Sequence, residues 1–298
     1  MPRALFGGGA DRFLRAEAQP LGFLAVAGAA PSGPKQARVA ALGTKATTVS
    51  VAGIGTTAAK AVHGPLLAEA LGTLGCRVAS ATALGSPAEL INDPSWQLAV
   101  VLSPYKREVG EHCDRLAPSA TATGVVDTVI RTPAGTVGFN TNTWAAQSAL
   151  EVLLGGAEPQ RVLVLGAGAS ARSVALAVRR AWPGCELAIV ARSLASAEAL
   201  AAQFSGEAIV APSAERAPDV VVNTTTWGET EASEAEPLEV DLAGALAPGV
   251  RFFDLNNRVG ALPVQALQAG CSVLSGNVMQ RVTNASRAAL ARFTAANC

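Results

Sequence analysis

A glycine-rich turn between a strand-like run and a helix-like run most constrains the fold of this chain. The apolar segment RVLVLGAG (161–168) leads into ASARSVALAVRRA (169–181), and residues 166–171 (GAGASA) fit the pattern G-x-G-x-x-A. In this pattern the first glycine permits a tight turn, the second lets the backbone approach a pyrophosphate, and the small last residue permits close helix–strand packing. The helix N-terminus adds N–H groups and partial positive charge. We expect dinucleotide binding, and a plain strand–helix turn is the alternative.

Strand-like and helix-like segments alternate along most of the chain. The strand-like runs are 47–55, 76–80, 96–103, 124–131, 134–140, 161–168, 185–193, 207–212, 219–226 and 250–256. The helix-like runs are 65–75, 107–118, 144–154, 169–181, 195–204, 262–270 and 276–296. This alternation predicts an α/β fold built on doubly wound parallel sheets. GGAEPQ (155–160) is typical of a domain boundary.

The residues after the second strand of the glycine-turn unit indicate which dinucleotide is bound. An acidic residue there would take the ribose 2′-hydroxyl of NAD, but the chain has Ala191, Arg192 and Ser193. Arg192 can bind a 2′-phosphate through its forked guanidinium, helped by Ser193 and by Arg172 on the first helical turn. The pattern therefore favours NADP, with an exposed surface arginine as the alternative. NTTTWG (223–228) follows the next strand and is expected to lie along the dinucleotide.

Composition excludes several classes of protein. The net charge is zero, so no basic field is available for nucleic acid. No apolar run reaches ~18 residues, so we expect no membrane span. Five scattered cysteines and only two histidines favour reduced thiols and argue against a metal site. These features together predict a cytoplasmic protein.

Lys106 lies in SPYKRE (103–108), directly after a buried strand. Ligands of α/β proteins bind at the carboxyl ends of the strands. A lysine at that edge could donate a proton to a forming alkoxide and take it back in the reverse reaction. The alternative is a solubilising lysine at the surface.

Taken together, these motifs resemble the shikimate/quinate dehydrogenase family from about residue 46 to 296. Four family segments match in the first part of the chain: P-x-K at PYK (104–106), G-A-V-N-T-V at GVVDTV (124–129), G-x-N-T-D at GFNTN (138–142) and the glycine loop at GAGASAR (166–172). Four more follow: N-R-T at ARS (191–193), N-A-T-P-x-G at NTTTWG (223–228), D-x-x-Y at DLNN (254–257) and G-x-x-M at GNVM (276–279). No single match is decisive, but eight occur in the family's order.

The resemblance implies a substrate-binding domain over 46–155, an NADP-binding Rossmann domain over 156–276, and a C-terminal helix over 277–298 that packs back toward the substrate domain. Residues 1–45 are an extension of undefined structure. It implies a small-molecule substrate and leaves a homodimer open. The cofactor-binding residues that it implies are Gly166, Gly168, Ala169, Ser170, Arg172, Arg192, Ser193, Thr224, Thr225, Leu255 and Gly276. The catalytic residues are Lys106 and Asn142, and the substrate-binding residues are His63, Asp127, Asn140, Asn257 and Thr283.

Departures from the family pattern gather on the substrate side. Asn142 stands where the family has the aspartate that partners the lysine, and Asp127 stands where the family has an asparagine. No serine lies near His63, where the family has a pair that holds the substrate carboxylate. We therefore expect a substrate that lacks the shikimate carboxylate arrangement, such as one that carries an amine. Two alternatives stay open: a true shikimate dehydrogenase whose pocket compensates for the changes, and an inactive homologue that binds NADP.

Overall fold

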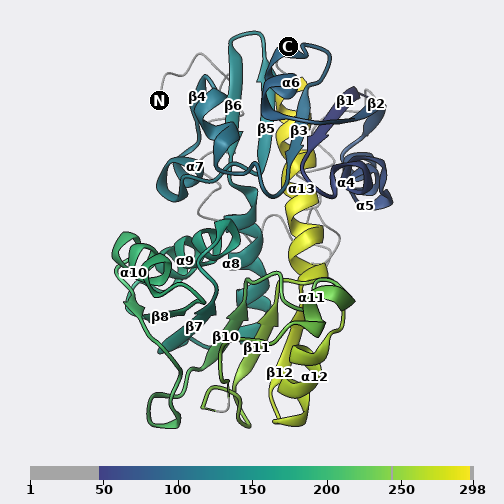
Figure 1. Ribbon diagram of the computed structural model, residues 1–298. Coiled ribbons are helices and arrows are strands. Elements are labelled where there is room, and N and C mark those ends of the chain that lie inside the picture. The colour runs from purple at the N-terminus through teal and green to yellow at the C-terminus, as the bar shows by residue number, and fades with distance from the viewer. Residues whose placement is uncertain (1–46, 243, 296–298) are drawn as a thin grey trace. The chain divides into compact units, whose positions relative to one another are not determined.

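The computed structural model describes residues 47–242 and 244–295. Contacts divide the chain into two compact units, one ending at Ala145 and resuming at Arg281, the other running from Ala146 to Gln280. The divisions fall inside helix α8 (Thr141–Leu154) and helix α13 (Gly276–Ala295), which is the long yellow helix of Figure 1. The sequence predicts the first division after α8, at residues 155–160. The predicted N-terminal extension lies outside the described residues.

The first unit is built on a mixed six-stranded sheet with the order β2-β1-β3-β5-β6-β4. Its strands are β1 (Thr47–Ile54), β2 (Cys76–Leu84), β3 (Leu98–Val101), β4 (Arg115–Leu116), β5 (Thr128–Thr132) and β6 (Gly135–Phe139). Strand β1 pairs in parallel with β2 and β3, whereas β5 pairs antiparallel with β3 and β6. All four residues of β3 are buried, as the apolar run predicts.

The first unit also contains helices α4 (Ala58–His63), α5 (Pro65–Thr73), α6 (Pro87–Asn92) and α7 (Pro118–Thr123), with a short 3₁₀ helix over Glu108–His112. The helix predicted over 107–118 is wrong. Pro118 begins α7 instead of ending a helix, because the first helical position needs no N–H donor. Asp114 draws the intervening chain to β6 by accepting hydrogen bonds from the backbone N–H and the hydroxyl of Thr136.

The second unit contains a parallel six-stranded sheet with the order β12-β11-β10-β7-β8-β9. Its strands are β7 (Arg161–Leu165), β8 (Glu186–Val190), β9 (Glu207–Ala208), β10 (Val220–Asn223), β11 (Arg251–Asp254) and β12 (Ser272–Ser275). From β7, the sheet continues through β8 and β9 on one side and through β10, β11 and β12 on the other. This order is that of the dinucleotide-binding doubly wound fold, and its switch point lies between β7 and β10.

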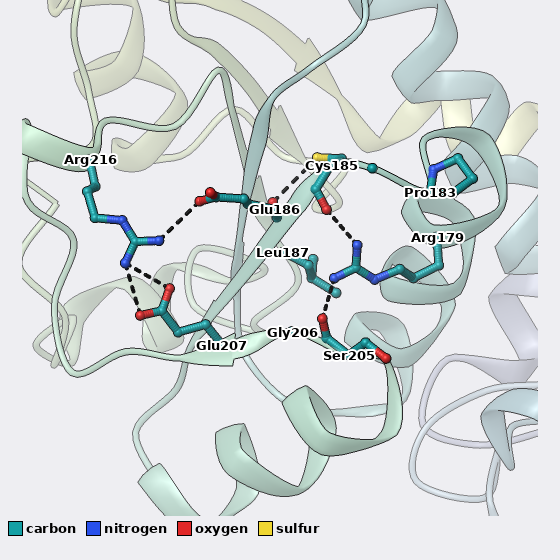
Figure 2. Close-up of a pocket in the computed structure, with 10 residues that line it drawn as sticks. Arg179, Pro183, Cys185, Glu186, Leu187, Ser205, Gly206, Glu207 and Arg216 are labelled. Carbon is teal, nitrogen blue, oxygen red and sulfur yellow. Dashed lines mark hydrogen bonds and ion pairs between the residues drawn. The ribbon is translucent and has the colours of Figure 1, made fainter.

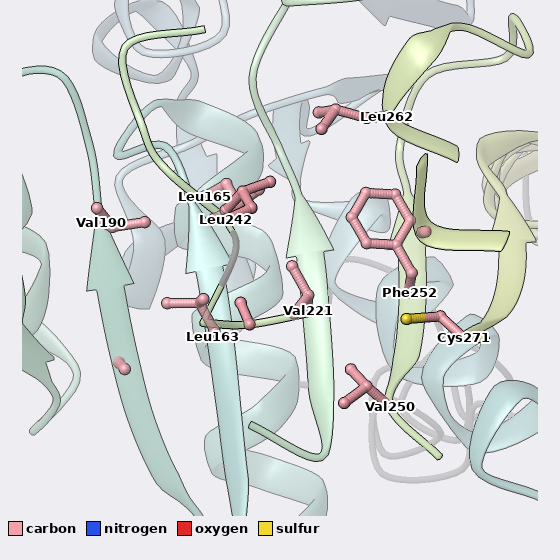
Figure 3. Packing of buried hydrophobic residues seen from close by; sticks show 12 residues of the cluster. Leu163, Leu165, Val190, Val221, Leu242, Val250, Phe252, Leu262 and Cys271 are labelled. Atoms are coloured by element: carbon pink, nitrogen blue, oxygen red, sulfur yellow. The ribbon is translucent and has the colours of Figure 1, made fainter. Parts of the chain in front are cut away.

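The helices of the second unit are α9 (Ala169–Ala181), α10 (Leu194–Gln203), α11 (Glu231–Ala235) and α12 (Ala261–Gln268), with a 3₁₀ turn over Ala214–Arg216. The bounds of α9 are those that the sequence predicts. An aliphatic core covers one face of the sheet, where side chains such as Leu163, Val221 and Phe252 pack together (Figure 3). The predicted α/β class with a Rossmann-like second unit is confirmed.

Gly276 joins β12 to α13, and its backbone lies against that of Leu255 and Asn256. Its N–H donates to the carbonyl oxygen of Asn256 at 3.1 Å. A Cβ atom on Gly276 would overlap the carbonyl oxygen of Leu255 and would lie 2.9 Å from that of Asn256. Only a residue without a side chain fits this position.

Replacing Gly276 by alanine is therefore expected to lower the free energy of unfolding by about 3 kcal/mol, since the methyl group must displace backbone. Urea unfolding measures the change. Gly72→Ala is the matched control, because a Cβ at Gly72 in α5 meets nothing within 4 Å. The control should be neutral or more stable by up to about 1 kcal/mol. Equal stabilities of the two variants would contradict the close approach at Gly276.

Candidate functional site

No side chain caps the N-terminus of α9, so its first backbone N–H groups could bind an anion. Gly166 ends β7 with a φ of 103°, and its N–H donates to the carbonyl of Val190 at 2.8 Å. Gly168 then precedes the helix, no side chain caps it, and no acidic residue lies in the first turn. A Cβ on Gly168 would meet nothing within 4 Å, so space is free beside the unbonded N–H groups. The turn fits the pyrophosphate of a dinucleotide.

The turn after β8 carries the two residues expected to select the cofactor. The Arg192 side chain is 85% exposed, and its Nε lies 3.9 Å from Glu239 Oε2 in a loose ion pair. Ser193 accepts a hydrogen bond from the N–H of Ser196 and thereby caps α10. Arg172, on the first turn of α9, donates to the side-chain oxygen of Gln203 at the end of α10. Arg192 is thus the guanidinium most available for a phosphate.

The turn after β10 packs against the glycine turn. The Thr224 hydroxyl donates to the Leu165 carbonyl at 2.6 Å. A Cβ on Gly166 would lie 2.8 Å from Thr224 Oγ1 and 3.2 Å from Thr225 Cγ2. Position 166 therefore requires glycine for two reasons, its positive φ and the close approach of Thr224 and Thr225. Thr224 and Thr225 thus lie against the glycine turn that precedes α9.

A buried carboxylate lies at the end of the neighbouring strand, at the first residue of the DLNN match (254–257), to which no role is assigned from the sequence. Asp254 ends β11, is only 2% exposed, and accepts hydrogen bonds at 3.0 Å from Asn223 Nδ2 and from the N–H of Asn256. Burial raises the pKa of Asp254 to about 6, and the two hydrogen bonds pull it in the opposite direction. An acidic residue at the carboxyl end of a buried strand is the signal that could have indicated it.

In the first unit, the stretch GFNTNTW (138–144) forms the start of α8. Asp127 Oδ1 accepts from the N–H of Thr141 at 3.1 Å, and Oδ2 accepts from the N–H of Asn142 at 2.7 Å. Asn140 Oδ1 accepts from the N–H of Thr143 at 3.1 Å. Three N–H groups that the helix itself cannot bond are satisfied in this way. The negative charge of Asp127 also interacts favourably with the partial positive charge at the N-terminus of the helix.

The predicted substrate contacts of Asp127 and Asn140 differ from this arrangement. Both side chains are completely buried. Both oxygens of Asp127 accept hydrogen bonds from the helix terminus, and Asn140 Nδ2 donates to Thr123 Oγ1 at 2.9 Å. Neither side chain has exposed surface, and the hydrogen bonds that both make lie within the protein.

Asn142 and Thr283 do meet, although they lie 141 residues apart in the chain. The hydroxyl of Thr283, on α13, donates to Asn142 Oδ1 at 3.2 Å. Since the oxygen of the amide faces Thr283, the NH₂ group is turned the other way. Asn142 therefore presents a hydrogen-bond donor where a carboxylate would present an acceptor.

Arg287, one helical turn after Thr283, is the second residue that sequence reasoning missed. Its Nε donates to Thr128 Oγ1 at 3.1 Å, and that hydroxyl donates to Asp127 Oδ1 at 2.7 Å. Its Nη2 donates to the backbone carbonyl of Asp127 at 3.2 Å. Burial lowers the pKa of Arg287, and the nearby charge of Asp127 raises it. No sequence signal separates Arg287 from the surface arginines.

The remaining predicted residues have distinct settings. Lys106 is 9% exposed, and its carbonyl accepts from the N–H of Val126 at 2.7 Å, which places its backbone beside the segment that leads into β5. His63 is exposed at the end of α4 in the first unit. Asn257 is exposed in the second unit, after β11. The structure therefore brings Asn142 and Thr283 together, whereas His63 and Asn257 make no described hydrogen bond.

A cavity of about 510 Å³ in the second unit is not the candidate site. It lies at the amino ends of β8 and β9, opposite the edge that carries the glycine turn. Figure 2 shows that Arg216 points to Glu186 and Glu207, while Arg179 donates to backbone carbonyls. Both arginines are thus engaged within the protein, and the cavity lies away from the carboxyl ends of the strands, where ligands of α/β proteins bind.

Within residues 47–242 and 244–295, no group of three His, Cys, Asp or Glu side chains could hold a metal ion. In the same ranges, no helix combines the length and apolarity needed to cross a membrane. The four described cysteines are free. Burial raises the pKa of the Cys113 thiol to about 12 and that of Cys185 to about 11, so neither is a reactive thiolate at neutral pH.

Fold and site together define a two-unit α/β protein whose second unit has the topology and the open glycine turn of a dinucleotide-binding domain. No family model matches the chain. Over 164 residues it is 38% identical to a shikimate dehydrogenase (NADP(+)) of Acidiphilium cryptum, covering 53% of this chain and 56% of that protein. Over 193 residues it is 31% identical to the corresponding enzyme of Moorella thermoacetica, covering 60% and 63%.

A solved structure extends the likeness over most of the chain. It is the shikimate 5-dehydrogenase of Thermus thermophilus in complex with NADP(H) and shikimate, with a TM-score of 0.68 at 27% identity. The match covers 82% of this chain and 91% of that one. In sequence, the chain spans little more than half the length of the first curated relatives that it matches. The resemblance to the shikimate/quinate dehydrogenases is confirmed.

The buried charge of Asp254 predicts a pH-dependent stability. Its pKa rises from about 3.9 in the unfolded chain to about 6 in the folded one. Its contribution is therefore fully present below about pH 4 and is lost as the pH rises through 6. Asp254→Asn, which cannot ionise, should be more stable than the wild type by about 2–3 kcal/mol at pH 7.5.

Urea unfolding of both proteins from pH 4 to 8 measures this difference, which should shrink toward zero at pH 4. Glu215→Gln, an exposed acid of the same unit, is the control and should show no such trend. A wild type more stable than Asp254→Asn at pH 7.5 would contradict the raised pKa.

Proposed function

We propose that this chain is an NADP-dependent oxidoreductase of the shikimate dehydrogenase type. It would interconvert a CH–OH group and a C=O group on a small polar substrate that differs from shikimate. The observation that carries the proposal is the open N-terminus of α9, which has two glycines before it and no capping side chain. The names of the curated relatives, which include NADP(+), support the same cofactor.

In the second unit, the N–H groups of Ala169 and Ser170 on α9 would hold the pyrophosphate. The exposed guanidinium of Arg192 would bind the 2′-phosphate in place of its loose ion pair with Glu239, which lies 3.9 Å away. Thr224 and Thr225 would lie along the dinucleotide. A bound NADPH would supply the hydride that reduces the carbonyl carbon of the substrate.

In the first unit, Lys106 would donate a proton to the carbonyl oxygen as the carbon–oxygen bond becomes an alcohol. In the oxidative direction the same amine would receive that proton. Asn142 would orient the substrate with its NH₂ group, which Thr283 turns away from itself. Because that group donates, it suits an acceptor on the substrate, and it cannot take a proton from a hydroxyl as a carboxylate can.

The substrate side supports a change of substrate. Asp127 and Asn142 stand where the family has an asparagine and an aspartate, and the Asn142 N–H donates to Asp127 Oδ2 at 2.7 Å. The one carboxylate of the pair thus stands at position 127, where both of its oxygens accept hydrogen bonds from the start of α8, and not at position 142. An amine-bearing substrate loses support, since Asp127 has no exposed surface. The second candidate, a true shikimate dehydrogenase, is supported by the relatives, one of which carries that name and is 38% identical over 164 residues.

Cofactor choice tests the role of Arg192. Replacing Arg192 by alanine should weaken NADPH binding about tenfold or more, because a charge-assisted contact to the 2′-phosphate is lost. Binding of NADH, which lacks that phosphate, should stay unchanged. Fluorescence titration of both cofactors measures the two affinities, with the exposed Arg77→Ala as control. Equal loss for both cofactors would refute the assignment.

Turnover tests the substrate side. With NADP⁺ and shikimate, the wild type should turn over slowly, and the reciprocal variant Asp127→Asn/Asn142→Asp should gain at least about tenfold, since it returns the carboxylate to the ligand side. Lys106→Ala should lose about 10²–10⁴-fold with any substrate that is turned over. The exposed Lys60→Ala is the matched control.

Absorbance of NADPH follows these rates. Brisk shikimate turnover by the wild type would support the true shikimate dehydrogenase instead. Full activity of Lys106→Ala would remove Lys106 from the mechanism.

A further inference from the structure

Asp254 presents a physical problem, because its charge costs stability and no cation in the described part of the chain compensates it. The carboxyl group is 2% exposed, and burial raises its pKa while the hydrogen bonds from the Asn256 N–H and Asn223 Nδ2 lower it. The neighbouring strands β10 (VVVN) and β12 (SVLS) and helix α12 (ALPVQALQ) contain no titratable residue. Asparagine would fill the same space without this cost, so stability alone does not account for an acid here.

The hydrogen bonds of Asp254 lead to the edge that carries the glycine turn. Asn223, whose Nδ2 donates to Asp254, accepts at Oδ1 from the N–H of Thr225 at 3.0 Å and from its hydroxyl at 2.7 Å. Thr225 in turn packs against the glycine turn, within 3.2 Å of where a Cβ on Gly166 would stand. A continuous chain of contacts thus runs from the carboxylate to the open terminus of α9.

A second branch holds the neighbouring turn. Asn256, whose N–H donates to Asp254 Oδ1, uses its Nδ2 to donate to the Trp227 carbonyl at 2.8 Å. Its own carbonyl accepts from the N–H of Gly276, where α13 begins. One carboxylate therefore ties together the turn after β10, the turn after β11 and the start of α13.

We propose that Asp254 is a positioning residue for dinucleotide binding, acting through Asn223 and Asn256 on the turns that flank the α9 terminus. The inference rests on the proposed function. A carboxylate accepts stronger hydrogen bonds than a neutral amide or a protonated acid, so the ionised form holds the turns more firmly. The charge is kept for binding, although it lowers the stability of the free protein.

The proposal predicts opposite effects on stability and on affinity. At pH 8, Asp254→Asn should bind NADPH about 3- to 10-fold more weakly than the wild type, although it unfolds less readily. The ratio of the two dissociation constants should approach 1 at pH 5, where Asp254 of the wild type is protonated. Because both proteins meet the same ligand at each pH, titration of the 2′-phosphate cancels from the ratio.

Fluorescence titration with NADPH from pH 5 to 8 measures this ratio. Asn223→Ala, which interrupts the path to Thr225, should weaken binding at pH 8 and show no further dependence on Asp254 when combined with Asp254→Asn. Glu215→Gln controls for the loss of one negative charge. Long-range electrostatics alone predicts the reverse, namely tighter NADPH binding by Asp254→Asn, and that result would overturn the proposal.

A ratio of 1 at every pH, or a ratio above 1 that does not change with pH, would also overturn it. If the wild type binds neither NADPH nor NADH, the proposed function itself fails and this inference fails with it. If the wild type binds NADPH and only the predicted ratio is missing, the proposed function stands and the role of Asp254 alone is refuted.

Discussion

The first N–H groups of an α-helix have no partner inside the helix, and the two units of this protein meet that constraint in opposite ways. At α8, the Asp127 carboxylate and the Asn140 amide satisfy three N–H groups and leave that terminus closed. At α9, no side chain caps the terminus, and glycines keep the space beside it free. What each unit contributes to the candidate site therefore depends on whether the first N–H groups of its helix are already hydrogen-bonded.

Two buried charged residues, Arg287 and Asp254, are connected to these termini through hydrogen bonds, and burying each charge costs stability. Arg287 reaches Asp127 through the Thr128 hydroxyl, and the negative charge of Asp127 offsets part of the cost of burying the guanidinium. Asp254 has no such partner among the described residues, and burial raises its pKa to about 6. Uncompensated buried charges are expensive, and they are typical of sites where position matters more than stability.

Much of the second unit could be predicted from local pattern, whereas parts of the first could not. The predicted helix over 169–181 has the bounds of α9, since its amphipathic period and the glycines before it are local signals. The helix predicted over 107–118 is wrong, because Pro118 suits the start of a helix as well as its end, and Asp114 draws the chain to Thr136 on β6. The short strand β12 and the helices α4, α6, α7 and α11 escaped prediction, since short elements are stabilised by what they pack against.

The sequence by itself determined the glycine turn, the absence of an acid near Arg192, and the exchange of asparagine and aspartate between positions 127 and 142. These are statements about which residues follow one another, and the chemistry of a turn or a strand end depends on near neighbours. Only the tertiary structure decided that Asp127 caps α8 and that Thr283 turns the Asn142 amide from 141 residues away. It also decided that Asp254 connects through Asn223 to the turn beside Gly166. Such contacts form between strand ends and helices that are distant in the chain, so local pattern carries no record of them.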